Sequence, residues 1–145
     1  MNNDVDILLV EDDDGHANLV IRNLKRVGLD NEIRLFKNGK EILDFLSGTE
    51  INDAQSYLIL LDIRMPKVNG IEVLKEIKDD KQWAKIPVIM LTTTDDPEEI
   101  STCHQLGCNN YIVKPVDYEK FIDAIKSLGL FLKVVEMPTL KGGGS

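Results

Sequence analysis

Short, uninterrupted apolar runs alternate with helix-like segments along the whole chain. The runs VDILLV (5–10), YLILLD (57–62) and PVIML (87–91) are too short for buried helices and are bounded by polar or turn-forming residues. Continuous runs of this kind are typical of parallel strands that are covered on both faces. Ile33 and Leu35, which alternate with polar neighbours, and NYIVK (110–114) complete a predicted set of five strands.

Between these strands, apolar residues recur at three- and four-residue spacing, which predicts amphipathic helices. The first helix is expected over 14–27, with Gly28 as its stop, and the second over about 39–47. A third follows Gly70, a fourth begins in the DDPEE run (95–99) and ends at Gly107, and a fifth begins after Asp117. This alternation predicts an α/β fold, a doubly wound, five-stranded parallel sheet with five helices.

The chain has 145 residues and a formal net charge of −8, and these two numbers limit the number of domains and the classes of partner. The length suits one domain, which we place at 4–137, with a tail over 138–145 whose end (141–145, KGGGS) is typical of a flexible linker or an expression scar. The acidic balance argues against nucleic acid and anionic membranes as partners. No apolar run approaches the ~20 residues of a membrane span, and the MNNDVD start is acidic, so we expect the cytoplasm.

Charged and hydroxyl side chains stand where the predicted strands end. Glu11 and Asp12 follow the first strand, Asp62 ends the third, Thr92 the fourth and Lys114 the fifth. Because ligands of such sheets bind beside the carboxyl ends of the strands, we expect these side chains to converge. Three carboxylates at that density need a hard cation such as Mg²⁺, which often shares its coordination sphere with phosphate. The set predicts a metal-assisted phosphoryl site in which one carboxylate is the nucleophile.

Each of these residues alone has a simpler explanation. An acid after a strand is most often a loop residue or a helix cap, as we expect for Asp13 and Asp14. The rival site classes fit less well, however. A flavin phosphate loop needs hydroxyls and amides where Glu11 and Asp12 stand, and the P-loop motif does not occur in the sequence. A phosphatase with an aspartyl nucleophile needs a second Asp two residues later, where Arg64 stands.

Four motifs give the chain a family resemblance. LLVEDD (8–13), LLDIRMPKVNG (60–70), IPVIMLTTT (86–94) and YIVKP (111–115), in this order and spacing, resemble the receiver domain of two-component response regulators over about residues 4–130. The chain resembles small stand-alone receivers of the chemotaxis-regulator type. LTTT (91–94) and VVEMP (134–138) also resemble regulators that are paired with phytochrome-type kinases. The family implies a flavodoxin-like sheet with strand order 2-1-3-4-5.

The resemblance implies a role for each site residue. Asp62 would be the phosphoacceptor for a sensor histidine kinase or a phosphotransfer protein. Glu11 and Asp12 would hold Mg²⁺ together with Asp62, and the backbone carbonyl of Arg64 would be a further ligand. Lys114 would pair with the phosphoryl oxygens, and the Lys114–Pro115 bond would be cis. The chain would then be a phosphoprotein that phosphorylates and dephosphorylates itself, not an enzyme in the usual sense.

The same resemblance implies a switch and a set of rate-tuning residues. Thr92 and Tyr111 match the switch pair: the phosphate draws in the threonine hydroxyl, the ring turns inward, and the surface of the fourth helix, fifth strand and fifth helix changes. Arg64 and Thr94 match positions that tune hydrolysis, and we expect Arg64 to shield the phosphate, which makes self-dephosphorylation slow. Thr93 stands where the family commonly has Ala or Gly, so it either narrows access to Asp62 or is simple variation.

Some features keep their alternatives. His16 either faces the pocket or is a solvated residue of the first helix, and we expect the solvated position. We expect the last helix to continue beyond 128, where the apolar residues of 128–138 either form a homodimer face or extend the core. The chain carries no basic DNA-binding module, so its output is expected to be contact with a downstream protein target or phosphotransfer. The rival function is a receiver-like interaction module that does not use phosphorylation.

Overall fold

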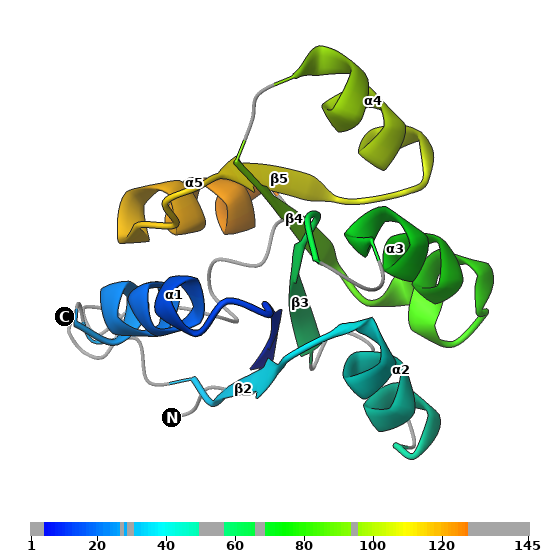
Figure 1. The fold of residues 1–145 in the computed structure, drawn as a ribbon, viewed down its shortest axis with the longest axis horizontal. Helices are drawn as coiled ribbons and strands as arrows, with labels where there is room; N and C mark the ends of the chain where they lie inside the picture. The colour runs from blue at the N-terminus through cyan, green and yellow to red at the C-terminus, as the bar shows by residue number, and fades with distance from the viewer. Residues whose placement is uncertain are drawn as a thin grey trace, which may run out of the picture.

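Five parallel strands form one sheet in the computed structural model, which describes residues 5–26, 28, 31–49, 57–65, 69–93 and 96–127. The strand order β2-β1-β3-β4-β5 confirms the predicted flavodoxin-like sheet. In chain order the elements are β1 (Asp6–Val10), α1 (Asp14–Arg26), β2 (Ile33–Phe36), α2 (Gly39–Ser47), β3 (Tyr57–Asp62), α3 (Gly70–Asp79), the 3₁₀ turn η2 (Trp83–Lys85), β4 (Val88–Thr92), α4 (Pro97–Gln105), β5 (Asn110–Val113) and α5 (Tyr118–Ser127) (Figure 1).

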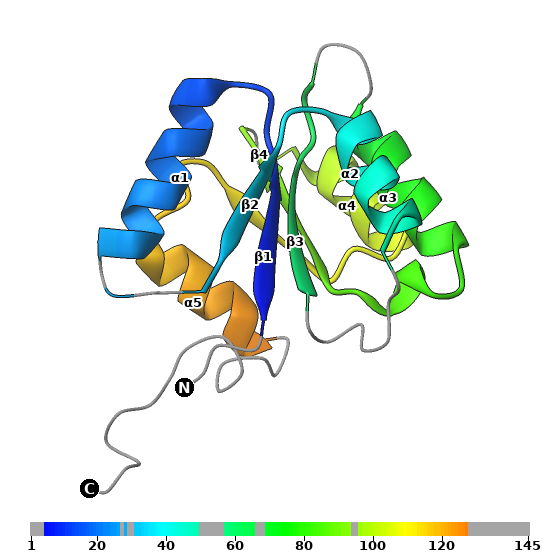
Figure 2. The ribbon, with the colours of Figure 1, turned by 90° about the horizontal axis from the view of Figure 1, so that it is seen from below.

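The helices cover the sheet on both faces, as the continuous apolar strands require. Helices α1 and α5 lie on one face, and α2, α3 and α4 lie on the other (Figures 1 and 2). Alternate residues of β1 divide between the two cores: Ile7 and Leu9 pack with α1 and α5, whereas Leu8 and Val10 pack with α2 and α3. The side chains of these strands therefore fill two separate cores, and the polar groups gather where the strands end.

Short polar signals in the sequence set the helix ends. Asn38 caps α2 by accepting a hydrogen bond from the Glu41 N–H, and Asp96 caps α4 by accepting one from the Glu98 N–H. Gly28 follows α1 with a φ of 95°, a left-handed conformation that favours glycine and ends the helix. Helix α5 begins after Asp117, as predicted, and the expected extension beyond residue 128 lies outside the described residues.

The connection from β3 to α3 brings a helix very close to the end of a central strand. The backbone N–H of Gly70 donates to the carbonyl of Ile63 at 2.8 Å. A Cβ on Gly70 would lie 2.1 Å from the Asp62 carbonyl oxygen and 2.8 Å from Cα of Ile63, so the residue must be glycine for this approach. Within the described ranges, no helix is long and apolar enough to cross a membrane.

Candidate functional site

Three carboxylates meet at the ends of β1 and β3. Glu11 and Asp12 follow β1 directly, and Asp62 is the last residue of β3, which pairs with β1 in parallel register. One oxygen from each carboxylate lies within 4.8 Å of the others. Glu11 is 1% exposed and Asp62 is 3% exposed, whereas Asp12 is half-buried. The structure therefore brings together the acids that the sequence placed at separate strand ends.

Lys114, directly after β5, supplies a positive charge to this cluster. Its ammonium Nζ lies 2.6 Å from Oε1 of Glu11 and 3.3 Å from Oδ1 of Asp62. The Lys114–Pro115 peptide bond is cis, as the resemblance implied. One ammonium cannot neutralise three carboxylates, so the cluster keeps an excess of negative charge.

That excess charge acts on Asp62. The pKa of the Asp62 carboxyl is raised from 3.8 to about 7, first by burial and then by the hydrogen bond with Glu11 and the charge of Glu11, which together outweigh the lowering effect of Lys114. A carboxylate that resists ionisation in this way gains from a cation beside it. Its neighbours offer the oxygen ligands that Mg²⁺ prefers, and the open side leaves room for water and phosphate oxygens. The donor set therefore fits a hard divalent cation.

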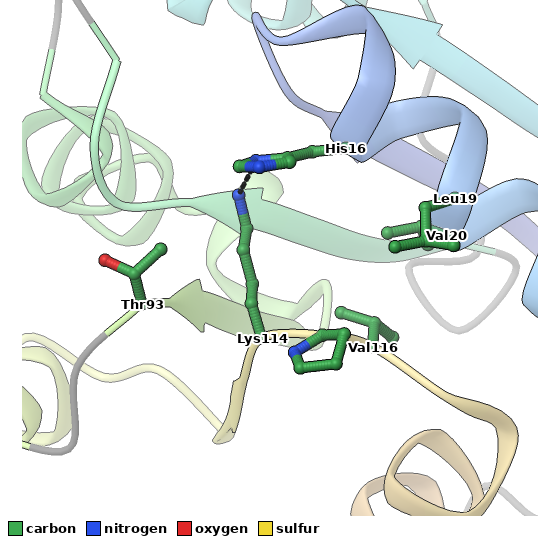
Figure 3. Close-up of a pocket in the computed structure, with 7 residues that line it drawn as sticks. His16, Leu19, Val20, Thr93, Lys114 and Val116 are labelled. Carbon is green, nitrogen blue, oxygen red and sulfur yellow. Dashed lines mark hydrogen bonds between the residues drawn. The ribbon is translucent and has the colours of Figure 1, made fainter.

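The cluster opens into a cleft that continues into an apolar groove. The cleft has a volume of about 520 Å³, and its lining includes Asp13, Arg64, Met65 and Asn69 beside the three acids. The groove, about 260 Å³, is lined by Leu19, Val20, Pro115 and Val116. His16, Thr93 and Lys114 line both, and Figure 3 shows Lys114 extending between the groove and the ring of His16. The charged site and the apolar groove thus share a rim.

His16 is exposed on α1, as we expected, and it also lies at the rim of the cleft. Its Nδ1 lies 3.1 Å from the ammonium of Lys114 (Figure 3). The cause is the start of α1: Asp13 accepts a hydrogen bond from the His16 N–H at 2.9 Å, which places His16 in the first turn beside the cleft. Asp13 is thus the cap that the sequence predicted, and Asp14 pairs with Lys37.

Thr92 ends β4 with its side chain buried, and it has a partner that the sequence did not predict. Its hydroxyl Oγ1 donates to Oε1 of Glu99 at 3.2 Å, and Oε2 of Glu99 lies 3.6 Å from the guanidinium of Arg64. Glu99 follows Thr92 by seven residues and lies in the first turn of α4, outside the four motifs of the family resemblance. The exposed guanidinium of Arg64 thus pairs with Glu99 on α4.

Of the remaining predicted site residues, the structure describes Tyr111 and Thr93 but not Thr94. Tyr111, in β5, is half-buried, and its ring meets that of His104 on α4 edge-on, with 5.9 Å between the ring centroids. Thr93 is exposed at the rim of the cleft. Thr94 lies outside the described residues, so its predicted effect on hydrolysis stays a prediction.

Comparison with known proteins agrees with this geometry. Residues 7–126 match the model of the response regulator receiver domain, which is most of the chain. The chain belongs to the response regulator receiver family. Members of this family are typically signalling modules of two-component systems rather than classical enzymes.

Individual receivers show how far the similarity reaches. The chain is 33% identical to the response regulator Rcp1 of Synechocystis sp. over 91% of this chain and 92% of Rcp1. It is 37% identical to the chemotaxis protein CheY homolog of Campylobacter jejuni over 74% of this chain and 80% of that protein.

Two solved structures share the fold. The bacteriophytochrome response regulator AtBRR matches with a TM-score of 0.78 and 34% identity over 92% of this chain and 98% of that one. The Mn²⁺-bound form of Rcp1 matches with a TM-score of 0.67 and 31% identity over 91% and 97%.

Proposed function

We propose that this receiver domain accepts a phosphoryl group on Asp62 from the phosphohistidine of a cytoplasmic sensor histidine kinase or a phosphotransfer protein, with Mg²⁺ bound. The proposal is carried by one observation: three carboxylates and the ammonium of Lys114 meet in one open cleft. In the transfer, an ionised oxygen of Asp62 bonds to phosphorus while the donor's phosphorus–nitrogen bond breaks, and the leaving imidazole takes a proton from solvent.

Different residues of the chain would bind the metal and the phosphoryl group. Glu11, Asp12 and Asp62 would hold the metal, with the backbone carbonyl of Arg64 as a further ligand by family resemblance. When bound, Mg²⁺ supplies positive charge against the carboxylates and polarises the phosphoryl oxygens. Lys114 pairs with a phosphoryl oxygen on Asp62, because its ammonium already lies 3.3 Å from that carboxylate.

The apolar groove supports a protein as the phosphodonor. Leu19 is 40% exposed, although it is a large hydrophobic residue on a helix, and it lines the groove that shares Lys114 with the acidic cleft. A donor that brings a phosphohistidine to Asp62 must cover this rim, and an apolar helix face would bury Leu19 there. The similarity to AtBRR makes a phytochrome-type kinase the first donor to test.

The phosphoryl group would then act on Thr92 and Tyr111. A phosphoryl group carries about −1.5 to −2 charges and three strong acceptor oxygens, which is enough to draw in the Thr92 hydroxyl. The Tyr111 ring would follow and change the α4, β5 and α5 surface that a downstream protein reads. We also propose Arg64 and Thr94 as the residues that tune hydrolysis of the phosphate.

Intact mass after incubation with Mg²⁺ and acetyl phosphate tests the acceptor. We expect the mass of one phosphoryl group to be added to the wild-type chain, and neither Asp62→Asn nor a chelated sample to gain it. Asp44→Asn, which removes an exposed carboxylate from α2, is the matched control and should be phosphorylated normally. No mass gain from acetyl phosphate or from any phosphorylated kinase would favour the rival function, an interaction module that does not use phosphorylation.

A second variant tests the donor. Leu19→Glu should slow transfer from the phosphorylated core of a bacteriophytochrome kinase and leave phosphorylation by acetyl phosphate unchanged, because only the protein donor covers the groove. Asn18→Glu adds the same charge at an exposed neighbouring position of α1 and is the control. Equal transfer rates in Leu19→Glu and Asn18→Glu would rule out this groove as the contact surface.

A further inference from the structure

Glu99 connects three elements at the functional end of the sheet. Its side chain, 18% exposed, extends from the first turn of α4 to the hydroxyl of Thr92 at the end of β4 and to Arg64 after β3. Thr92 is 1% exposed, so this hydrogen bond forms in surroundings where water competes little for the hydroxyl. Glu99 thus accepts a hydrogen bond from Thr92, the same residue whose hydroxyl is proposed to donate to the phosphoryl group.

The two acceptors compete, because a threonine hydroxyl has one proton to donate. While the proton points to Glu99, it is not available to an oxygen on Asp62. A phosphoryl group adds negative charge on the side of Thr92 that lies next to β3, so the proton is drawn from one anion to the other. Arg64 is near both anions, because it pairs with Glu99 and also lines the cleft that contains Asp62.

We propose that Glu99 is a positioning residue that holds Thr92 and Arg64 in the unphosphorylated state, and that phosphorylation frees the first turn of α4 by taking Thr92 from it. This inference rests on the proposed function, since it needs a phosphoryl group on Asp62. It adds a residue that opposes the switch, so the strength of the Glu99 contact sets how readily the domain changes state.

The way α4 is packed explains why one polar contact has this influence. Cys103 is the buried residue of α4, whereas α1, α2, α3 and α5 each bury three or four residues. A helix with so little buried apolar surface is held weakly by packing. The hydrogen bond from Thr92 to Glu99 therefore joins the Asp96 cap among the polar contacts that fix the first turn of α4.

Beryllium fluoride, a stable mimic of the aspartyl phosphate, measures this competition directly. Its affinity in saturating Mg²⁺ is determined by NMR titration of the wild-type chain, Glu99→Gln and Glu98→Gln. We expect Glu99→Gln to bind the mimic about tenfold more tightly, because a neutral acceptor holds the Thr92 hydroxyl less strongly than a charged one. Glu98→Gln removes the same charge from the same exposed turn and should change the affinity less than about twofold.

A double variant separates the hydrogen bond from simple charge repulsion. In the Thr92→Ala background the effect of Glu99→Gln should be clearly smaller than in the wild-type background, because only the pair of Glu99 with Arg64 is left to break. A tenfold gain that persists without the Thr92 hydroxyl would overturn the proposal, and so would equal affinities of the wild-type chain and Glu99→Gln. A wild-type chain that binds no beryllium fluoride and gains no phosphoryl mass would refute the proposed function, and this inference with it.

Discussion

The ammonium of Lys114 lies closer to Glu11, at 2.6 Å, than to the phosphoacceptor candidate Asp62, at 3.3 Å. The lysine therefore serves as the internal counter-ion of a carboxylate that is 1% exposed. In this state one ammonium contacts both carboxylates, and the shorter contact is to Glu11 and not to the residue that it is proposed to assist. The competition between Glu11, Asp62 and an incoming phosphate for one ammonium yields the first prediction.

Removal of that ammonium should weaken the metal-free fold and strengthen metal binding. Lys114→Gln leaves Glu11 and Asp62 buried without their cation, so we expect the free energy of unfolding in urea with chelator to fall by about 3 kcal/mol. The same loss should raise the affinity for Mg²⁺, because more negative charge remains to be neutralised. Lys40→Gln breaks an exposed pair with Asp44 and should change stability by less than about 0.5 kcal/mol. Unchanged stability in Lys114→Gln would contradict the counter-ion role.

Asp62 should make the metal-free protein less stable as the pH rises. Its folded-state pKa of about 7 lies above the ordinary value of 3.8, so the folded state binds more protons between these values. The stabilisation is complete below 3.8 and is lost as the pH rises through about 7. Asp62→Asn should therefore stabilise the chelated protein more at about pH 8 than at about pH 5, as measured by urea unfolding. An equal effect at both pH values would contradict the raised pKa.

Mg²⁺ should stabilise the fold through the acid cluster. A ligand that binds only the folded state at a hundred times its dissociation constant adds about 2.7 kcal/mol, which raises the thermal midpoint by several degrees. Asp12→Asn should lose most of this shift, since it removes one of the three clustered carboxylates. Asp14→Asn removes an acid of the same sequence run that pairs with Lys37 instead, and should keep the shift. A shift of equal size in both variants would place the metal elsewhere.

Two glycines should respond in opposite ways to the same substitution. Gly70→Ala forces a Cβ to within 2.1 Å of the Asp62 carbonyl oxygen, so we expect a loss of at least about 2 kcal/mol in stability and slower phosphorylation. In Gly48→Ala the nearest atom lies at 3.5 Å, an ordinary contact, and stability should change little or rise. Urea unfolding and the mass assay measure both effects. A stable, normally phosphorylated Gly70→Ala would show that the loop after β3 can move aside.

The sequence predicted the fold and the acid cluster because both follow from short-range patterns. The continuous run ILLV (7–10) specifies a buried strand, and parallel pairing then brings Glu11 and Asp62 to the same end of the sheet. The contacts of Glu99 and His16 depend instead on the positions of α4 and α1 against the sheet and on the conformations of the two side chains. The pattern of apolar residues in the sequence predicts neither of these, and both residues resemble ordinary polar positions of a first helical turn.

The shallow seating of α4 also affects how the domain can diverge. Because one side chain of this helix is buried, substitutions over most of its surface leave the two cores intact. Substitution is much less tolerated in the cleft. The backbone leaves no room for a Cβ at Gly70, and Asp62 and Lys114 form an ion pair. The α4 face that we propose for contact with downstream proteins can therefore accept substitutions that the cleft cannot.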